Sequence, residues 1–132
     1  MVLSEPFTIV PLLFVRCEPP EVEAVIDRLW GGDETLIVVS SDLSHFHPYE
    51  TAKKLDRSAI DAIVDLDVER MRNESACGKG PVLALMTVAR KKGWRAKLLD
   101  YRNSGDTAGG RSRVVGYAAI AFHEPAAQTE GG

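Results

Sequence analysis

The sequence predicts one α/β domain in which helices flank a small, mostly parallel or mixed sheet of about four strands in a layered α/β/α arrangement. Two near-continuous apolar runs, at residues 7–15 and 36–39, are typical of strands covered on both faces. A helical pattern lies between them, and a β-α-β unit of this kind is parallel and right-handed. The 132 residues, 45% of them hydrophobic, suffice for a single core.

The first predicted strand contains Pro11, which removes a backbone donor and favours an edge position or a local irregularity. The helix after it begins at Pro19-Pro20 and ends at Gly31-Gly32, because proline suits a first helical turn and glycine suits a helix end. The second predicted strand, residues 36–39, completes the unit.

Helical periodicity then extends from Tyr49 to about Asn73. Asp67 is a suitable N-cap if this stretch forms two helices. After a loop, Pro81 fits the first turn of a further helix that stops at Gly93.

Two strands complete the predicted domain. Residues 94–98 alternate as in a half-buried strand that continues to Tyr101, and residues 113–122 form the last strand after a Gly-rich connection. We expect one domain over residues 1–123 and a disordered tail over residues 124–132.

The composition of the chain argues against nucleic-acid and membrane partners and favours one cellular compartment. The net charge of −3 and the pI near 5.6 argue against a nucleic-acid partner. No apolar stretch approaches the ~20 residues that span a bilayer, and the N-terminus lacks the pattern of a signal peptide, so we expect no membrane partner. Two cysteines without a spaced framework favour a reducing compartment, and hence the cytoplasm.

The polar run at residues 40–47 follows the second predicted strand. It places titratable side chains at a strand's carboxyl end, where ligands gather in open α/β sheets. The imidazole of His45 can bind a metal or act as a general base, and Asp42 can orient that ring. The alternative is that His45 is an ordinary core or surface histidine.

Other residues of the run are further pocket candidates. His47 precedes Pro48, which favours a lead-in to a helix over a role in the site. Ser41 and Ser44 lack the Gly-x-Ser-x-Gly elbow of an acyl-transfer nucleophile, so neither is expected to attack a substrate.

Cys77 lies directly before a predicted helix. Free amide groups and the helix dipole stabilise a thiolate there, and Lys79 would act in the same direction. Such a thiolate can be a metal ligand, a nucleophile or a redox-sensing group, and the alternative is packing as a small apolar side chain. Gly78 and Lys79 could also cradle an anion, although the complete phosphate-binding motif is absent. Cys17 has no partner motif and is expected to pack.

Several motifs occur together in the order and spacing of one protein family. They are Ile9-Val10-Pro11-Leu12, Ser40-Ser41-Asp42-Leu43-Ser44-His45, Cys77-Gly78-Lys79-Gly80-Pro81, Tyr101-x-x-Ser104-Gly105-Asp106 and Val114-Val115-Gly116-Tyr117-Ala118-Ala119. With this set, which extends to about His123, the chain resembles the MEMO family, called protein B in the AmmeMemoRadiSam gene cluster of bacteria and archaea. The resemblance implies a central sheet flanked by helices, similar to the class III extradiol dioxygenases.

The resemblance also implies a site. The family's metal ligands are expected to be two histidines from the N-terminal half and the cysteine that corresponds to Cys77. The histidine that matches His45 faces the same pocket, where the dioxygenases place a catalytic base, and Asp42 matches an acidic residue there. This chain resembles only the C-terminal half of the family fold, so the two N-terminal histidines have no counterpart in it.

We therefore expect a truncated or split MEMO-like protein with a remnant metal site suited to iron-dependent redox chemistry. Cys77 and His45 would be ligands, His45 and Asp42 the catalytic pair, and copper or zinc are alternatives to iron. This half alone could lack the metal, and the resemblance leaves enzymatic activity open. The alternative function is a non-catalytic binding or scaffold module that uses the same pocket for a peptide or a small anion.

The expected partners follow from the missing half. A homodimer, or a separate N-terminal MEMO half, would supply the absent ligands. The gene cluster implies a functional link to radical-SAM and AMMECR-type proteins.

Overall fold

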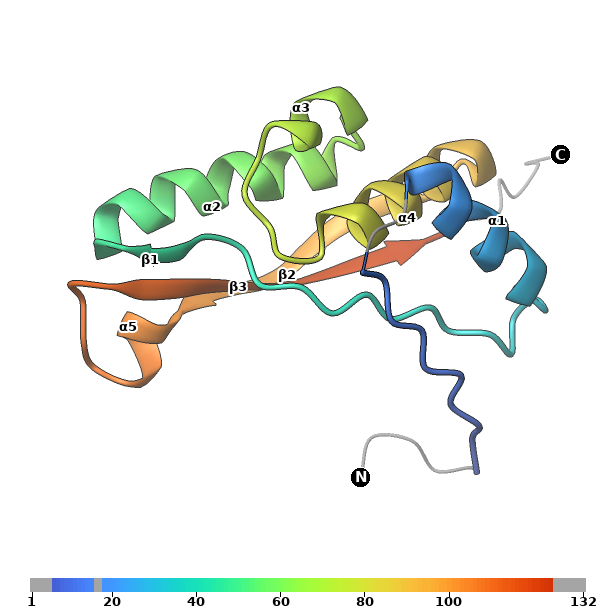
Figure 1. The fold of residues 1–132 in the computed structure, drawn as a ribbon, viewed down its shortest axis with the longest axis horizontal. Coiled ribbons are helices and arrows are strands. Elements are labelled where there is room, and N and C mark those ends of the chain that lie inside the picture. The colour runs from blue at the N-terminus through green and yellow to red at the C-terminus, as the bar shows by residue number, and fades with distance from the viewer. Residues whose placement is uncertain (1–5, 16–17, 125–132) are drawn as a thin grey trace, which may run out of the picture.

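The computed structural model describes residues 6–15 and 18–124 (Figure 1). Cys17 and residues 125–132 of the expected tail lie outside the described residues. The elements are α1 (Pro19–Leu29), β1 (His45–His47), α2 (Tyr49–Val64), α3 (Val68–Arg72), α4 (Lys79–Lys92), β2 (Arg95–Asn103), α5 (Ser104–Thr107) and β3 (Val114–His123).

The sheet of the described residues has three strands in the order β1-β3-β2, and helices flank it, which confirms an α/β fold. Both strand pairs are antiparallel, so the expectation of a mostly parallel or mixed sheet was wrong. The two long strands, β2 and β3, are joined through the short α5, and a short connection of this kind permits only antiparallel pairing. Leu99 is an extra residue in β2 where the register shifts.

The two predicted parallel strands do not form in the described part of the chain. Residues 7–15 and 36–39 are irregular and have no strand partner there (Figure 1). A strand needs a neighbour for its backbone donors and acceptors, and apolar composition alone does not provide one. Leu36 and Val38 are 79% and 78% exposed, whereas Ile37 and Val39 pack against the core.

The helix boundaries agree closely with the sequence prediction. The carboxylate of Asp67 accepts a hydrogen bond from the backbone N–H of Arg70 over 3.0 Å, so this residue is the N-cap of α3 and separates it from α2. Gly93 ends α4 with φ = 69°, a left-handed conformation that glycine adopts without strain. None of the helices in the described ranges is long and apolar enough to cross a membrane.

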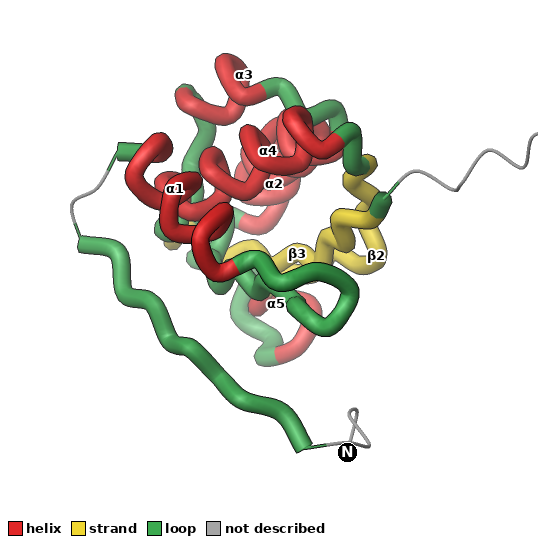
Figure 2. Tube along the Cα trace, turned by 90° about the vertical axis from the view of Figure 1, so that its right-hand side faces the viewer, coloured by secondary structure: helices red, strands yellow, loops and turns green. Residues whose placement is uncertain are grey.

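Two apolar clusters form the core. The first lies between the sheet and the helices α2, α3 and α4, with Ile60, Met71 and Met86 fully buried. The second joins α1 to α4 through Val22, Val88 and other buried residues. Figure 2 shows α1, α2 and α4 gathered on one side of β2 and β3. Hydrogen bonds between Asp42 and Cys77 hold the segment that leads into β1 close to the start of α4.

Candidate metal centre

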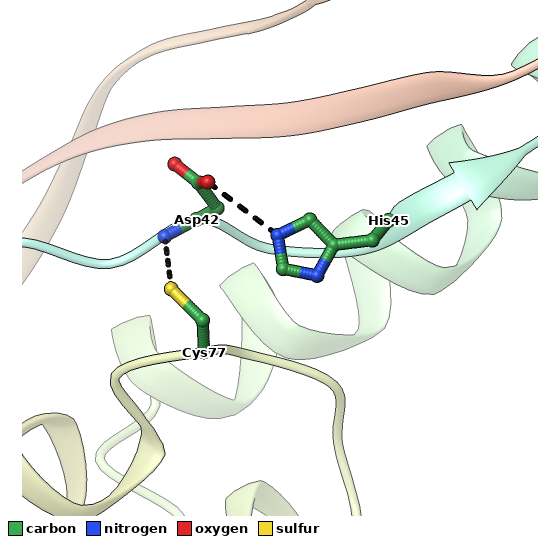
Figure 3. A group of neighbouring side chains, drawn as sticks. All are labelled: Asp42, His45 and Cys77. Atoms are coloured by element: carbon green, nitrogen blue, oxygen red, sulfur yellow. Dashed lines mark hydrogen bonds and ion pairs between the residues drawn. The ribbon is translucent and has the colours of Figure 1, made fainter. Parts of the chain in front are cut away.

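The structure brings three candidate ligands together from two distant parts of the sequence. Asp42 and His45 lie at the entry to β1, and Cys77 lies just before α4 (Figure 3). A carboxylate oxygen, an imidazole nitrogen and the thiol sulfur from these residues all lie within 4.8 Å of one another. The side chains of Asp42 and His45 are partly exposed, and Cys77 is exposed, so solvent reaches the group.

Reciprocal hydrogen bonds hold the two segments together. The backbone N–H of Asp42 donates to the Sγ of Cys77 over 3.1 Å, and the backbone N–H of Cys77 donates to the carbonyl oxygen of Asp42 over 3.2 Å. The hydroxyl of Ser41 accepts from the backbone N–H of Gly78 over 2.9 Å and lies 3.8 Å from the sulfur. The sulfur of Cys77 thus accepts a backbone hydrogen bond from the segment that also carries His45.

Gly78 permits this close approach. A Cβ atom at this position would lie 2.8 Å from the Cβ of Ser41 and 2.9 Å from the carbonyl oxygen of Ser40. Such contacts are well below van der Waals distance, and one of them is with backbone that cannot move aside. Any larger residue would push the segment of Cys77 away from that of Asp42.

His45 is positioned by an irregularity in β1. Its Nε2 lies 3.4 Å from the Oδ2 of Asp42. Phe46, the next residue, has φ = 60°, and the pairing of β1 with β3 shifts register at this point. A bulky residue in the left-handed region is strained, and a bulge of this kind redirects a neighbouring side chain. The guanidinium of Arg113 lies 5.0 Å from the centroid of the exposed Phe46 ring, within the range of a cation–π contact.

Asp56 supports the site from within the core. Its carboxylate is 1% exposed and accepts hydrogen bonds from the backbone N–H of Ser44 over 2.8 Å and from the hydroxyl of Tyr101 over 2.7 Å. Burial, and then the hydrogen bond to this carboxylate, raise the pKa of Tyr101 well above its usual range. Asp56 therefore ties α2 and β2 to the backbone between Asp42 and His45.

Polar contacts also join the start of α2 to α5, the short helix between β2 and β3. The hydroxyl of Tyr49 donates to Asp106 over 2.6 Å, which lowers the pKa of that carboxyl and raises the pKa of the tyrosine. Asn103 caps α5 by accepting from the backbone N–H of Gly105. These contacts give the Tyr101–Asp106 motif a structural role at the start of α2.

The remaining predicted site residues lie around the three-residue group. Ser44 is buried behind it, and its hydroxyl has no hydrogen-bond partner among the described residues. His47 ends β1 opposite Val114 and is not a member of the group. The ammonium of Lys79 donates to the carbonyl oxygen of Arg72 over 3.0 Å, a contact that directs it to the loop after α3.

Sequence reasoning did not identify Asp56 as a residue of the site. The signal was present, because Asp56 lies on the apolar stripe of α2 that includes Ala52, Ala59, Ile60 and Ile63. A carboxylate on such a stripe must find buried partners. Its partners, Ser44 and Tyr101, are far from it in sequence and are given only by the fold.

The donor set is chemically suited to a divalent metal. A thiolate, an imidazole and a carboxylate are ligands of iron and zinc, and three protein ligands leave coordination positions open. The mutual separation of at most 4.8 Å lets one ion contact all three after small side-chain movements. The residues present therefore fit a metal.

The chain is similar to proteins of known family. The family model described as "Memo-like protein" matches residues 1–121. A "MEMO1 family protein" of Archaeoglobus fulgidus is 38% identical over 131 residues, which cover 91% of this chain and 50% of the relative. A "MEMO1 family protein" of Methanosarcina mazei is 45% identical over 97 residues, which cover 68% of this chain and 36% of the relative.

The chain thus matches between about a third and a half of the length of these curated relatives. The matched range, residues 1–121, includes the positions of Asp42, His45 and Cys77. By the extent of the family match and the identity to its relatives, this chain belongs to the Memo-like protein family.

Proposed function

We propose that this chain carries part of the metal site of a Memo-like protein and binds a divalent metal ion, most suitably iron, through Cys77, His45 and Asp42. The observation that supports the proposal is the convergence of one sulfur, one nitrogen and one oxygen donor within 4.8 Å. The donors come from two segments that the chain holds together with backbone hydrogen bonds.

Each residue has a distinct role in this proposal. The thiolate of Cys77 is the anchoring ligand, and the N–H of Asp42 that donates to its sulfur stabilises the negative charge. The imidazole of His45 is a second ligand or a base beside the metal. The carboxylate of Asp42, 3.4 Å from Nε2, orients that ring and can itself approach the ion.

Bound iron would supply redox chemistry with oxygen or a substrate at the positions that the protein leaves open. The chain's own contribution is to bind the ion, orient the imidazole and provide a proton acceptor beside it. Asp42 and His45 are partly exposed and Cys77 is exposed, so the site is accessible from solvent.

The test is metal content. We expect the anaerobically purified chain, loaded with Fe²⁺ and desalted, to retain iron by plasma mass spectrometry, and Cys77→Ala to lose it. Ser75→Ala is the matched control, because Ser75 is exposed in the same loop and outside the ligand group. Equal iron in wild type and Cys77→Ala, or none in wild type, would refute the proposal.

A non-catalytic binding module is the second candidate. It is favoured by the large exposed apolar side chains of residues 6–15 and 36–39, which a partner could cover. Chelation separates the two functions, because a complex with another polypeptide that forms equally with and without EDTA supports the binding role, and one that is lost on chelation supports the metal role.

A further inference from the structure

A stack of three side chains leads away from the candidate metal ligands. The imidazole of His45 and the ring of Phe46 have centroids 5.8 Å apart, and the guanidinium of Arg113 lies 5.0 Å from the Phe46 centroid. Arg113 comes to this place because β3 begins at the next residue and pairs with β1 there. The fold thus places a permanent positive charge two ring contacts from a candidate ligand.

The ring of Phe46 is displayed on the surface. It is 62% exposed, and its backbone has φ = 60°, a conformation that is strained for a bulky residue. Strained residues of this kind collect at ligand sites, where the surrounding structure holds them in place. Packing does not account for the strain, because Phe46 belongs to neither apolar cluster of the core. An apolar ring beside the candidate ligands is therefore a surface that a bound molecule can cover.

The guanidinium of Arg113 has no carboxylate partner among the described residues. Other arginines do form ion pairs with acidic side chains, namely Arg57, Arg70, Arg72 and Arg102. Arg113 is exposed and forms none with the part of the chain that the structure describes. A guanidinium carries five N–H donors in a planar fork that matches the two oxygens of a carboxylate. Arg113 therefore has donors available for an anionic group from outside the chain.

Two neighbouring cations at this end of the sheet are accompanied by an acidic group. Arg111 and Lys53 lie 4.4 and 5.4 Å from the centroid of the Tyr49 ring. The hydroxyl of that tyrosine donates to the carboxylate of Asp106, so both cations lie near a negative charge of the chain's own. Arg113 lies over a different ring, that of Phe46. This makes Arg113, rather than Arg111 or Lys53, the group to bind an anion beside the metal site.

We propose that Arg113 binds the carboxylate of a small molecule whose other end occupies an open coordination position of the metal. The apolar chain of that molecule lies on the exposed Phe46 ring between the two ends. A carboxylate fits better than a phosphate, because one guanidinium neutralises a single charge and only part of a phosphate dianion. The inference rests on the proposed function, since it needs a metal at Asp42, His45 and Cys77. It names the ligand class of that site as short aliphatic acids with a metal-binding group at the far end.

The test uses the chain loaded with Co²⁺ in place of Fe²⁺, because the visible absorption of cobalt bound to a thiolate changes when an added ligand enters its coordination sphere. The probes are the dicarboxylates from succinate to suberate, each compared with the monocarboxylate of the same number of carbon atoms at constant ionic strength. We expect at least one dicarboxylate to bind wild type about 10-fold more tightly than its monocarboxylate, well beyond the statistical gain of having two identical ends.

Two variants assign this preference to Arg113. Arg113→Gln should remove it and leave the affinities for the monocarboxylate and for Co²⁺ unchanged. Arg95→Gln is the matched control, because Arg95 is exposed and pairs with His123 at the opposite end of β3. It should keep the preference of wild type.

The possible failures can be told apart. If Co²⁺ binds but no dicarboxylate exceeds the statistical gain, Arg113 is not an anion subsite and the metal site still stands. A preference that persists in Arg113→Gln also overturns the proposal, because another group would then bind the carboxylate. A chain that binds no Co²⁺ overturns the proposed function and this inference with it.

Discussion

The backbone N–H of Ser44 donates a 2.8 Å hydrogen bond to the buried carboxylate of Asp56. The other oxygen of that carboxylate accepts from Tyr101. This single side chain thus connects the long helix α2, the strand β2 and the segment that carries Asp42 and His45. Since Ser44 lies between those two candidate ligands, their separation depends on a group in the core.

Asp56→Asn tests this connection. The amide has the same shape but is neutral, so the hydrogen bonds to the N–H of Ser44 and the hydroxyl of Tyr101 lose the charge on their shared acceptor. We expect a loss of about 1–3 kcal/mol in the free energy of unfolding by urea denaturation. Asp65→Asn, at an exposed position after α2, should change the free energy of unfolding by less than about 0.5 kcal/mol. Equal effects of the two variants would contradict a structural role for Asp56.

Tyr101 should make stability depend on alkaline pH. Its pKa is raised in the folded state, first by burial and then by the hydrogen bond to Asp56. A raised pKa stabilises the fold fully below the unfolded value of about 10, and this contribution is lost as pH rises above it. The free energy of unfolding of wild type should therefore fall as the pH rises above about 10. Tyr101→Phe should show a smaller fall, whereas Tyr117→Phe on β3 should keep the wild-type slope.

Asp106 should make the stability of the fold depend on pH in the acidic range. The hydroxyl of Tyr49 and the backbone N–H of Asn103 donate to its carboxylate and lower its pKa. A lowered pKa stabilises the fold above the unfolded value of about 4, and this contribution is lost as pH falls through the folded value. Tyr49→Phe removes the main cause of the shift, so its stability should fall less steeply than that of wild type below pH 4, as followed by circular dichroism. An unchanged slope would mean that the pair does not survive in solution.

Local signals predicted the helices of this protein well. Asp67 and Gly93 set helix boundaries through contacts within a few residues, and such contacts are visible in the sequence. The sheet was predicted less well, because pairing depends on residues far apart in the chain. Residues 36–39 have a strand's composition but no neighbour in the described part of the chain, so the parallel unit that the sequence favoured does not form.

In the candidate site, too, contacts between near neighbours in the sequence could be predicted, and contacts between distant residues could not. Asp42 and His45 are three residues apart, and their proximity follows from the sequence. The approach of Cys77 was suggested by family resemblance, and the hydrogen bonds between the two segments supply its physical cause. Asp56 was missed because a carboxylate on an apolar helix stripe signals that a partner exists without saying where in the chain it lies.

Gly78→Ala gives the sharpest test of the contact between the two segments. The added methyl group would lie 2.8 Å from the Cβ of Ser41 and 2.9 Å from the carbonyl oxygen of Ser40, so the segments must separate. Because the sulfur of Cys77 is held by the N–H of Asp42, separation moves one ligand away from the other two. We expect affinity for Fe²⁺ or Zn²⁺ to fall by about 10- to 100-fold, the range found when residues that orient metal ligands are changed.

The control for that variant is Gly110→Ala. A Cβ atom at Gly110 would meet no atom within 4 Å, and the residue does not have a positive φ, so the same chemical change is made without a clash. Both variants should unfold cooperatively, and their metal affinities should be compared by competition with a chelator at one pH. If Gly78→Ala binds metal as tightly as Gly110→Ala, the close approach of the two segments does not hold the ligands together, and the metal site would have to be formed by other residues.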